Sequence, residues 1–167
     1  MQNSYFKIIP LKDHQLKEAS LVVKKCWQEN YKGIFPPDQL AKLDERIWQQ
    51  AMGSTGRHNL IALVGNKIVG LISYGVPRQI GKFPKDYGEL MSIYVLTKYH
   101  EKGIGTALMQ EAMQGLVRLG YSHAALWVEE ENQSAIKFYK RKGWQKTGKY
   151  QKQIILGQKV NLLQYQK

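Results

Sequence analysis

The chain has 167 residues, a formal net charge of +12 and a single cysteine, Cys26. At this length we expect one domain, residues 1–167, with enough residues to bury a core without disulfides. A lone cysteine excludes a disulfide framework within the chain and favours a reducing, cytoplasmic setting. The amino-terminal residues lack the pattern of a secretory signal, and no apolar stretch is long enough to span a bilayer, so we expect no membrane association.

The positive charge favours anionic partners, of which nucleic acid and a polyphosphate cofactor are the main classes. Apart from Lys140-Arg141-Lys142, the basic residues are spread along the chain. A nucleic-acid-binding module needs a clustered basic face with exposed aromatic residues, so the spread argues against one. Solubility alone explains most of the lysines.

The first third of the chain predicts one strand and two helices. A short β-prone segment, 5–9, ends at Pro10, and apolar residues at helical spacing predict a helix from Asp13 to about Glu29. After a loop rich in aromatic residues and prolines, a second helix is predicted from Pro36-Pro37-Asp38 through Trp48. Cys26 lies near the apolar face of the first helix, and we interpret it as a small buried residue.

The rest of the chain alternates strands and helices. Segments 59–64 and 67–75, joined by Gly65-Asn66, predict a hairpin, and a loop, 76–87, leads to a strand at 89–95. Then follow a helix ending at Gly120, an apolar strand at 123–128, a helix from about residue 133 to Gly143, a strand starting at Trp144, and one or two closing strands at 154–156 and 160–165 around Gly157. This order fits a mixed α/β sheet covered by helices.

The turn Glu101–Thr106 connects the strand at 89–95 to an amphipathic helix and contains two glycines, Gly103 and Gly105. Backbone amides at the start of a helix suit phosphate binding, although a simple tight turn has the same sequence. Because Leu108 stands where a third glycine would be, the turn is not a dinucleotide fingerprint, and no Gly-Lys-Ser/Thr follows to make a P-loop.

Two motifs resemble the GNAT superfamily of N-acetyltransferases. The first runs from Glu89-Leu90-x-x-Ile93-Tyr94-Val95 to Tyr99-His100-x-x-Gly103-Ile104-Gly105-Thr106-Ala107-Leu108, and the second is Val128-x-x-x-Asn132-x-x-Ala135-Ile136-x-Phe138-Tyr139-x-x-x-Gly143-Trp144. The resemblance implies a mostly antiparallel, twisted sheet of the α/β (α+β) class flanked by helices. One departure is His100, where the family usually has Gln or Arg.

The resemblance implies acetyl-CoA as co-substrate, with no metal. The turn amides would hold the pyrophosphate, and the pantetheine arm would pair with the backbone of a bulged strand splayed from 123–128. Two roles stay open for Lys140 and Lys142: they could contact the cofactor phosphates, or they could be solvated surface residues. The implied cofactor-binding residues are Ile93, Tyr94, Val95, His100, Glu101, Lys102, Gly103, Ile104, Gly105, Thr106, Asn132 and Tyr139.

The reaction implied is direct attack of an amine on the thioester. Val95 is the expected oxyanion donor through its amide, and Tyr139 the acid that protonates the leaving thiolate. Glu89 is the expected base, acting through a water molecule, and a solvated carboxylate at the start of a strand is the equally open alternative. Asn132 is expected on the pantetheine arm, or as a helix cap.

The identity of the acceptor amine is the property that the sequence defines least. Candidate residues for the wall of the acceptor pocket are Tyr31, Phe35, Trp127 and Tyr165. For Tyr31 a role in core packing is as well supported as a role in the pocket, and for Phe35 core packing is favoured. Acidic residues that would attract a cationic amine such as a polyamine are Glu29, Asp38 and Glu129-Glu130-Glu131, although an acidic run is also typical of a solvated turn. Peptide amino termini, amino sugars and small amines stay open. So do a non-catalytic acyl-CoA sensor and a homodimer formed through an exposed carboxy-terminal edge strand.

Overall fold

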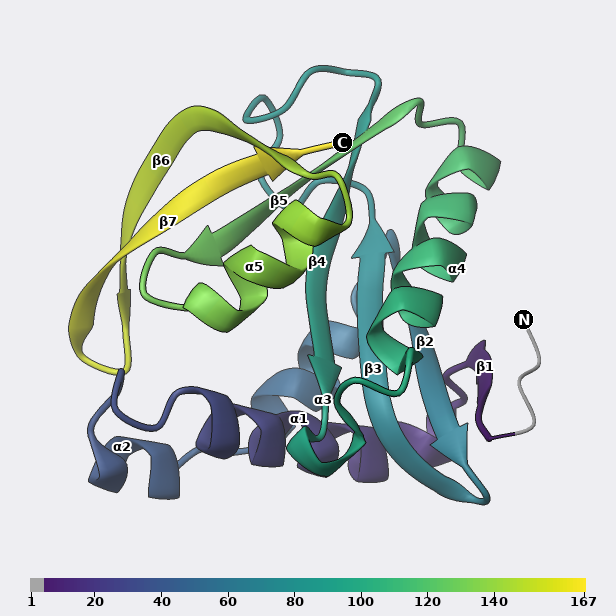
Figure 1. The fold of residues 1–167 in the computed structure, drawn as a ribbon, viewed down its shortest axis with the longest axis vertical. Helices are drawn as coiled ribbons and strands as arrows, with labels where there is room; N and C mark the ends of the chain where they lie inside the picture. The colour runs from purple at the N-terminus through teal and green to yellow at the C-terminus, as the bar shows by residue number, and fades with distance from the viewer. Residues whose placement is uncertain (1–4) are drawn as a thin grey trace.

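The computed structural model describes residues 5–167 and contains one seven-stranded sheet with helices on both faces (Figure 1). The predicted α/β class is confirmed. In chain order the elements are β1 (Lys7–Pro10), η1 (Asp13–Gln15), α1 (Leu16–Asn30), α2 (Pro37–Ala41), α3 (Arg46–Met52), β2 (Arg57–Val64), β3 (Lys67–Gly75), β4 (Tyr87–Val95), η2 (Thr97–Tyr99), α4 (Ile104–Arg118), β5 (His123–Glu129), α5 (Gln133–Arg141), β6 (Gln145–Ile155) and β7 (Gln158–Gln166).

The strand order is β1-β2-β3-β4-β5-β7-β6, and only the β4–β5 pair is parallel. That pair is short: Tyr87–Glu89 pairs with His123–Ala125, and the registered pairing stops there. Beyond this point β4 and β5 diverge, as Figure 1 shows. The sheet therefore opens into a V at its centre.

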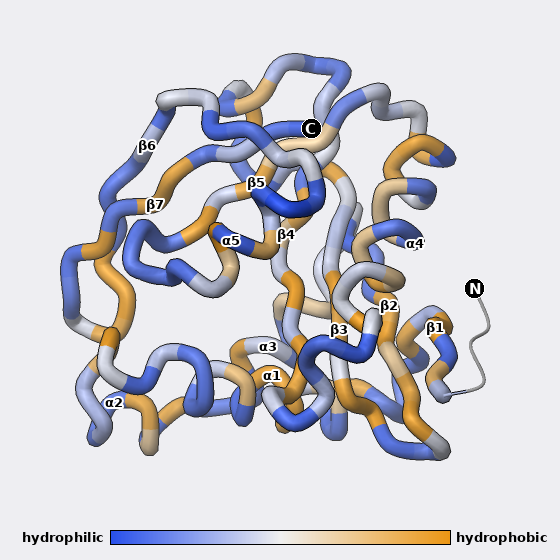
Figure 2. Tube along the Cα trace, viewed as in Figure 1, coloured by the Kyte–Doolittle hydropathy of each residue, from blue (hydrophilic) through white to orange (hydrophobic). Residues whose placement is uncertain are grey.

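Each face of the sheet has its own core. On one face α4 and α5 cover a cluster that includes Leu108, Leu116 and Tyr139. On the other face α1 and α3 cover Ile61 and Leu71, together with other apolar side chains. Figure 2 shows hydrophobic residues along the central strands β2, β3 and β4 and at intervals along α1 and α4. A third, smaller cluster lies where α1 and α2 meet the β6–β7 turn and contains Tyr31 and Phe35.

Several predicted boundaries are wrong, each for a local reason. The second predicted helix is two helices, because the Asp44 carboxylate accepts a hydrogen bond of 3.0 Å from the Arg46 backbone N–H and starts α3 anew. Pro10 belongs to β1 instead of following it, which an edge strand tolerates.

The carboxy-terminal strands also differ from the prediction. The strand predicted to start at Trp144 and the segment predicted at 154–156 belong to one long strand, β6 (Gln145–Ile155), with a register shift between Lys146 and Tyr150. Leu156 and Gly157, both at positive φ, turn the chain into β7. Since β6 is an edge strand with Tyr150 and Ile154 exposed, the homodimer stays a prediction for this edge.

Candidate active site

The centre of the site is the free edge of β4. Its register with β3 shifts between Ser73 and Tyr74, which leaves Met91 as an extra residue in a β-bulge. Past Glu89 the strand has lost its partner β5, so one side of its backbone faces the V. A strand edge of this kind can pair with an extended ligand.

The direction of the β4 backbone groups follows from one hydrogen bond. Leu96 donates its N–H to the Val69 carbonyl at 2.9 Å, toward β3. Because main-chain groups alternate along a strand, those of Ile93 and Val95 point away from β3, into the V. This is the orientation that the expected main-chain contacts require.

The turn after β4 has the backbone of an anion site. Glu101 and Gly103 adopt left-handed conformations, with φ of 60° and 81°, and α4 begins at Ile104. The first amides of α4 have no intrahelical acceptor and sit at the positive end of the helix. Gly103 is thus required by the turn itself, whereas a Cβ on Gly105 would make only ordinary contact with the Phe138 ring, at 3.4 Å.

Two side chains near the turn have other partners. His100 places Nε2 2.7 Å from the Val95 carbonyl oxygen and, as the Nε2–H tautomer, donates to it. Lys102 donates from Nζ to the Tyr5 hydroxyl at 3.1 Å and lies over the Tyr99 ring. In this structure His100 therefore holds the end of β4 against the turn.

Asn132 and Tyr139 approach the V from α5. The Asn132 side chain accepts a hydrogen bond from the Ala135 N–H at 3.2 Å, so the cap reading of this residue is correct, and Nδ2 lies 3.5 Å from the Tyr31 hydroxyl. Tyr139 is 6 % exposed, and its hydroxyl makes no hydrogen bond to any residue within 5–167. Burial, followed by the charge of Glu129, raises the pKa of Tyr139 well above its usual range, so the phenol stays protonated.

Glu89 is not a solvated carboxylate. It is 2 % exposed and both of its oxygens are occupied by Arg78. Oε2 accepts from the backbone N–H at 2.8 Å, and Oε1 accepts from Nε at 3.0 Å and Nη2 at 2.6 Å. The carboxylate is therefore engaged by charge-assisted hydrogen bonds on both of its oxygens.

Glu129 is a second carboxylate at the V, and the sequence singled it out only as part of an acidic run. Its Oε2 accepts a hydrogen bond of 3.0 Å from the Tyr31 hydroxyl. Burial raises the pKa of Glu129, partly offset by hydrogen bonds from its own backbone and from Tyr31. The alternation of residues along the strand could have identified Glu129 from the sequence. Leu126 and Val128 face the α4 side, so Trp127 and Glu129 face the other side.

The expected pocket walls separate into two groups. Trp127 stacks on Phe83 with ring centroids 6.1 Å apart, on the α1 side of the V. Tyr31 is buried against Trp27 but contributes its hydroxyl to Glu129, whereas Phe35 is packed at 2 % exposure. Tyr165 is wrong as a wall on that side, because it belongs to the core under α4 and α5.

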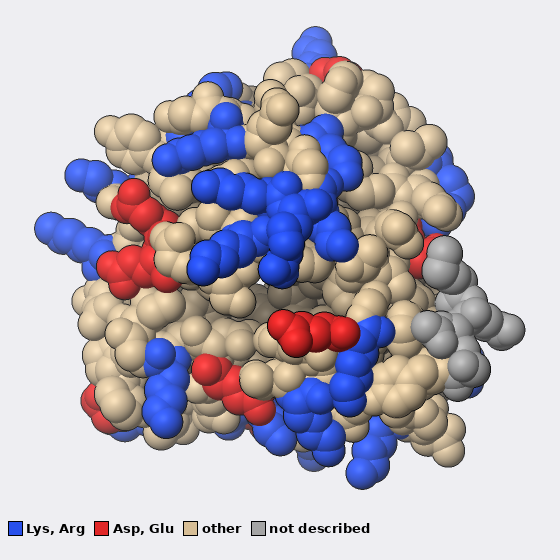
Figure 3. All heavy atoms as spheres, in the orientation of Figure 1, with Lys and Arg blue, Asp and Glu red and all other residues tan. Residues whose placement is uncertain are grey.

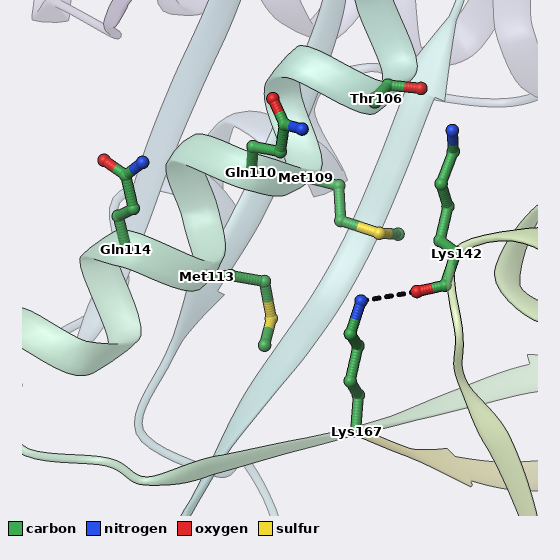
Figure 4. Close-up of a pocket in the computed structure, with 7 residues that line it drawn as sticks. All are labelled: Thr106, Met109, Gln110, Met113, Gln114, Lys142 and Lys167. Carbon is green, nitrogen blue, oxygen red and sulfur yellow. Dashed lines mark hydrogen bonds between the residues drawn. The ribbon is translucent and has the colours of Figure 1, made fainter.

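On the opposite side, a pocket of about 470 Å³ lies between α4 and the carboxy-terminal residues (Figure 4). Its lining residues are Thr106, Met109, Gln110, Met113, Gln114, Lys142 and Lys167. Lys167 donates from Nζ to the Lys142 carbonyl, which leaves the Lys142 ammonium pointing toward the Thr106 end (Figure 4). Figure 3 shows basic side chains gathered over α5, beside a central hollow. Within residues 5–167 no cluster of three or more His, Cys, Asp or Glu side chains is arranged to hold a metal ion.

Comparisons with known proteins assign the family. The model described as Acetyltransferase (GNAT) family matches residues 23–144. The chain belongs to the GNAT family of acetyltransferases. Members of this family are acyltransferases. As a separate observation, none of the helices within 5–167 is long and apolar enough to cross a membrane.

Individual relatives are moderately similar. The uncharacterized N-acetyltransferase YuaI of Bacillus subtilis is 29 % identical over 127 residues, covering 74 % of this chain and 71 % of the relative. The crystal structure of smu.2055 from Streptococcus mutans is 27 % identical with a TM-score of 0.72, over 96 % of this chain and 98 % of that one. PaiA N-acetyltransferase from Thermoplasma acidophilum, solved in complex with coenzyme A, shares 18 % identity and a TM-score of 0.69 over 97 % of this chain and 98 % of that one.

Proposed function

We propose that this GNAT protein transfers the acetyl group of acetyl-CoA to a primary amine by direct attack. The observation that carries the proposal is the free edge of β4, which ends at a turn with unpaired helix-start amides. One element thus offers main-chain hydrogen bonds to a pantetheine arm and an anion site to the pyrophosphate. A complex of the PaiA relative with coenzyme A supports this use of the fold.

The cofactor enters from the α4 and α5 side. Gly103–Thr106 binds the pyrophosphate, and the arm extends along β4 past Val95 and Ile93. Lys142, beside Thr106 in the pocket, is available to neutralise a cofactor phosphate. His100 acts indirectly, by holding the Val95 carbonyl at the junction of strand and turn.

The amide of Val95 is the expected oxyanion donor, and that of Ile93 is a second candidate. Both point into the V. The thioester lies at the far end of the pantetheine arm from the pyrophosphate, and Ile93 is farther from the turn by two residues, about 7 Å along a strand. An amide there would stabilise the negative charge that develops on the carbonyl oxygen.

In the chemical step the amine nitrogen forms a bond to the acetyl carbon while the carbon–sulfur bond breaks. The attacking amine must first lose the ammonium proton, and we propose Glu129 for this, with Glu89 the alternative from sequence. Burial raises the pKa of Glu129, which makes it a better base, whereas Glu89 is tied to Arg78. Tyr139 then gives its proton to the departing thiolate, and the phenol regains a proton from the nitrogen, which must lose one as the amide forms.

The setting proposed for this enzyme is the reducing cytoplasm, as expected from its single cysteine. Cys26 is fully buried, and burial raises the pKa of its thiol to about 12, so it is an inert core residue.

Two measurements test the function. Acetyl-CoA at concentrations well above a micromolar Kd is expected to raise the melting temperature, because a ligand that binds only the folded state stabilises it. A panel of primary amines is expected to include acceptors that release CoA thiol. Binding without thiol release from any amine identifies a non-catalytic acyl-CoA binder, and no melting shift contradicts the proposal altogether.

A further inference from the structure

Three buried polar side-chain atoms within residues 5–167 have no hydrogen-bond partner: Arg57 Nε, Ser92 Oγ and Gln164 Nε2. Buried polar atoms in native proteins are nearly always paired, so each of these atoms needs an explanation. Exchanging the oxygen and nitrogen of the Gln164 amide would still leave one of its polar atoms unpaired. Oε1 accepts from the Thr147 hydroxyl at 3.0 Å, so a turned amide leaves the oxygen unpartnered instead.

The three atoms come from three strands but lie on one face of the sheet. Ser92 pairs with Ser73, whose hydroxyl donates to Asn59 at 2.6 Å, and Asn59 in turn donates to the Met52 carbonyl of α3 at 2.8 Å. Arg57 stands two residues before Asn59 on β2 and shares its face. Gln164 lies directly opposite Trp127, which also faces the α1 side. All three therefore face the side of the V opposite α4 and α5, where the amine is proposed to enter.

One of the two arginines on this face has no ion-pair partner among residues 5–167. Arg78 is balanced by Glu89, with Nη2 and Oε1 2.6 Å apart. Arg57 interacts electrostatically with both, yet its guanidinium has no ion pair or hydrogen bond to any residue within 5–167. Burial, then the charge of Arg78, lowers the pKa of Arg57, but an arginine stays charged at any pH near neutrality. Arg57 interacts electrostatically with Glu89 and Tyr94, which lie on either side of Ser92 along β4, so the unpaired guanidinium and the unpaired hydroxyl face the same part of the sheet. Together they are complementary to an anionic oxygen group.

The entrance on this side is basic and aromatic. A pocket of about 350 Å³ is lined by Gly81, Lys82, Trp127, Gly148, Lys149, Tyr150 and Gln151, with no acidic residue among them. Two of the carboxylates that could attract a cationic acceptor already have protein partners. Glu29 accepts from the Thr97 hydroxyl at 2.8 Å, and Glu130 accepts from Asn161 at 3.0 Å. The charges thus favour an acceptor with an anionic group over a polyamine.

We propose that the acceptor is an amino acid or a similar small amine that carries a carboxylate, and that Arg57 and the Ser92 hydroxyl bind this carboxylate while Glu129 faces the amine. Gln164, farther along the face beside Trp127, is left to bind a polar group at the other end of the acceptor. The inference rests on the proposed acetyl transfer and specifies its acceptor.

The test uses matched pairs of amines that differ in the carboxylate. Phenylalanine is compared with 2-phenylethylamine and phenylalanine amide, and histidine with histamine, by CoA thiol release. Spermidine, glucosamine and a tripeptide represent the other acceptor classes. The carboxylated member of a pair is expected to have a kcat/KM at least about tenfold higher, because a charge-assisted hydrogen bond in a water-poor site is lost without it.

Variants then connect the preference to the residues. Arg57→Gln is expected to lower kcat/KM for the carboxylated acceptor about tenfold or more and to leave its decarboxylated partner nearly unchanged, so the preference disappears. Ser92→Ala is expected to have a smaller effect in the same direction. Arg118→Gln, an exposed arginine at the end of α4, is the matched control and keeps the preference. Acetyl-CoA melting shifts check that each variant still folds and binds cofactor.

The outcomes separate this inference from the proposed function. Equal or faster acetylation of the decarboxylated amines, or acetylation of spermidine, glucosamine or the tripeptide alone, overturns the carboxylate proposal and leaves acetyl transfer standing. A preference for carboxylated amines that survives Arg57→Gln overturns the role of Arg57. Thiol release from none of the amines, in a protein that binds acetyl-CoA, overturns both.

Discussion

The Tyr31 hydroxyl donates a hydrogen bond of 3.0 Å to Glu129 Oε2, across 98 residues of chain. This contact joins the end of α1 to the end of β5 at the open side of the V. It fixes the carboxylate together with a hydrogen bond from the Glu129 backbone. A largely buried carboxylate held only by neutral donors keeps a raised pKa, which an arginine partner would lower.

Glu129→Gln is expected to lower kcat by about 100-fold or more, the usual contribution of a general base. The amide oxygen can still accept from Tyr31, and removing a buried charge is expected to leave the melting temperature equal or higher. Steady-state thiol release and thermal unfolding measure the two effects. An unchanged kcat would exclude Glu129 as the base.

The pH dependence follows from the same residue. A base acts only when deprotonated, and burial raises the pKa of Glu129, so activity is expected to fall as pH drops through that raised value. The stability linkage has the opposite sign. The folded state holds this proton more tightly than the unfolded chain, so the contribution of Glu129 to stability falls as pH rises from the unfolded to the folded pKa. Profiles of kcat and melting temperature against pH, for the native protein and Glu129→Gln, check both signs. The variant should lose both dependences.

The Glu89→Gln variant tests whether Glu89, rather than Glu129, is the catalytic base. Because Arg78 would lose its partner, we expect a loss of roughly 1–3 kcal/mol in the free energy of unfolding, moderated by the 49 % exposure of the Arg78 side chain. Denaturant unfolding gives the stability, and kcat per folded molecule gives the chemistry. A stable Glu89→Gln with a large loss of kcat would instead support Glu89 as the base.

Tyr139→Phe is expected to lower kcat by about 100-fold while the Kd for CoA changes little, because the phenol contributes a proton and not a cofactor contact. The substitution removes one hydroxyl from a packed side chain and makes no larger cavity. Isothermal titration with CoA and steady-state kinetics give the two quantities. Phe138→Leu, on the same helix, is the matched control for packing. An unchanged kcat in Tyr139→Phe would remove this residue from the acid role.

Gly105→Ala tests whether the turn binds phosphate. An added Cβ would meet no protein atom closer than 3.4 Å, so the melting temperature without ligand should stay the same or rise slightly. Affinity for acetyl-CoA should fall by about tenfold or more if a ligand approaches this backbone closely. Titration with acetyl-CoA measures it. An unchanged Kd would show that no ligand lies against Gly105.

The sequence predicted the elements from local patterns and missed what depends on distant partners. Strand alternation and the glycine turn predicted the strands and the start of α4, whereas the splay that forms the V was implied only by the resemblance to the GNAT superfamily. The break between α2 and α3 depends on a single capping carboxylate, Asp44, inside an otherwise helical pattern. The engagement of Glu89 by Arg78 depends on how the loop after β3 folds back, and no periodicity encodes it. The shifted pKa values of Glu129 and Arg57 likewise come from burial against residues that are far away in the chain, which local sequence patterns do not predict.

Gly115→Ala is expected to destabilise the fold, although alanine normally strengthens a helix interior. Gly115 lies on the face of α4 that meets β3, and an added Cβ would overlap the Tyr74 ring at Cζ, Cε2 and the hydroxyl. Overpacking of this kind costs about 1–3 kcal/mol, which exceeds the roughly 1 kcal/mol gained in helix propensity. Thermal and denaturant unfolding measure the loss, and Gln114→Ala, exposed on the same helix, should be neutral. Tyr74→Leu in the Gly115→Ala background should recover part of the stability, because it removes the ring that the new methyl meets. A double variant no more stable than Gly115→Ala would place the strain elsewhere in α4.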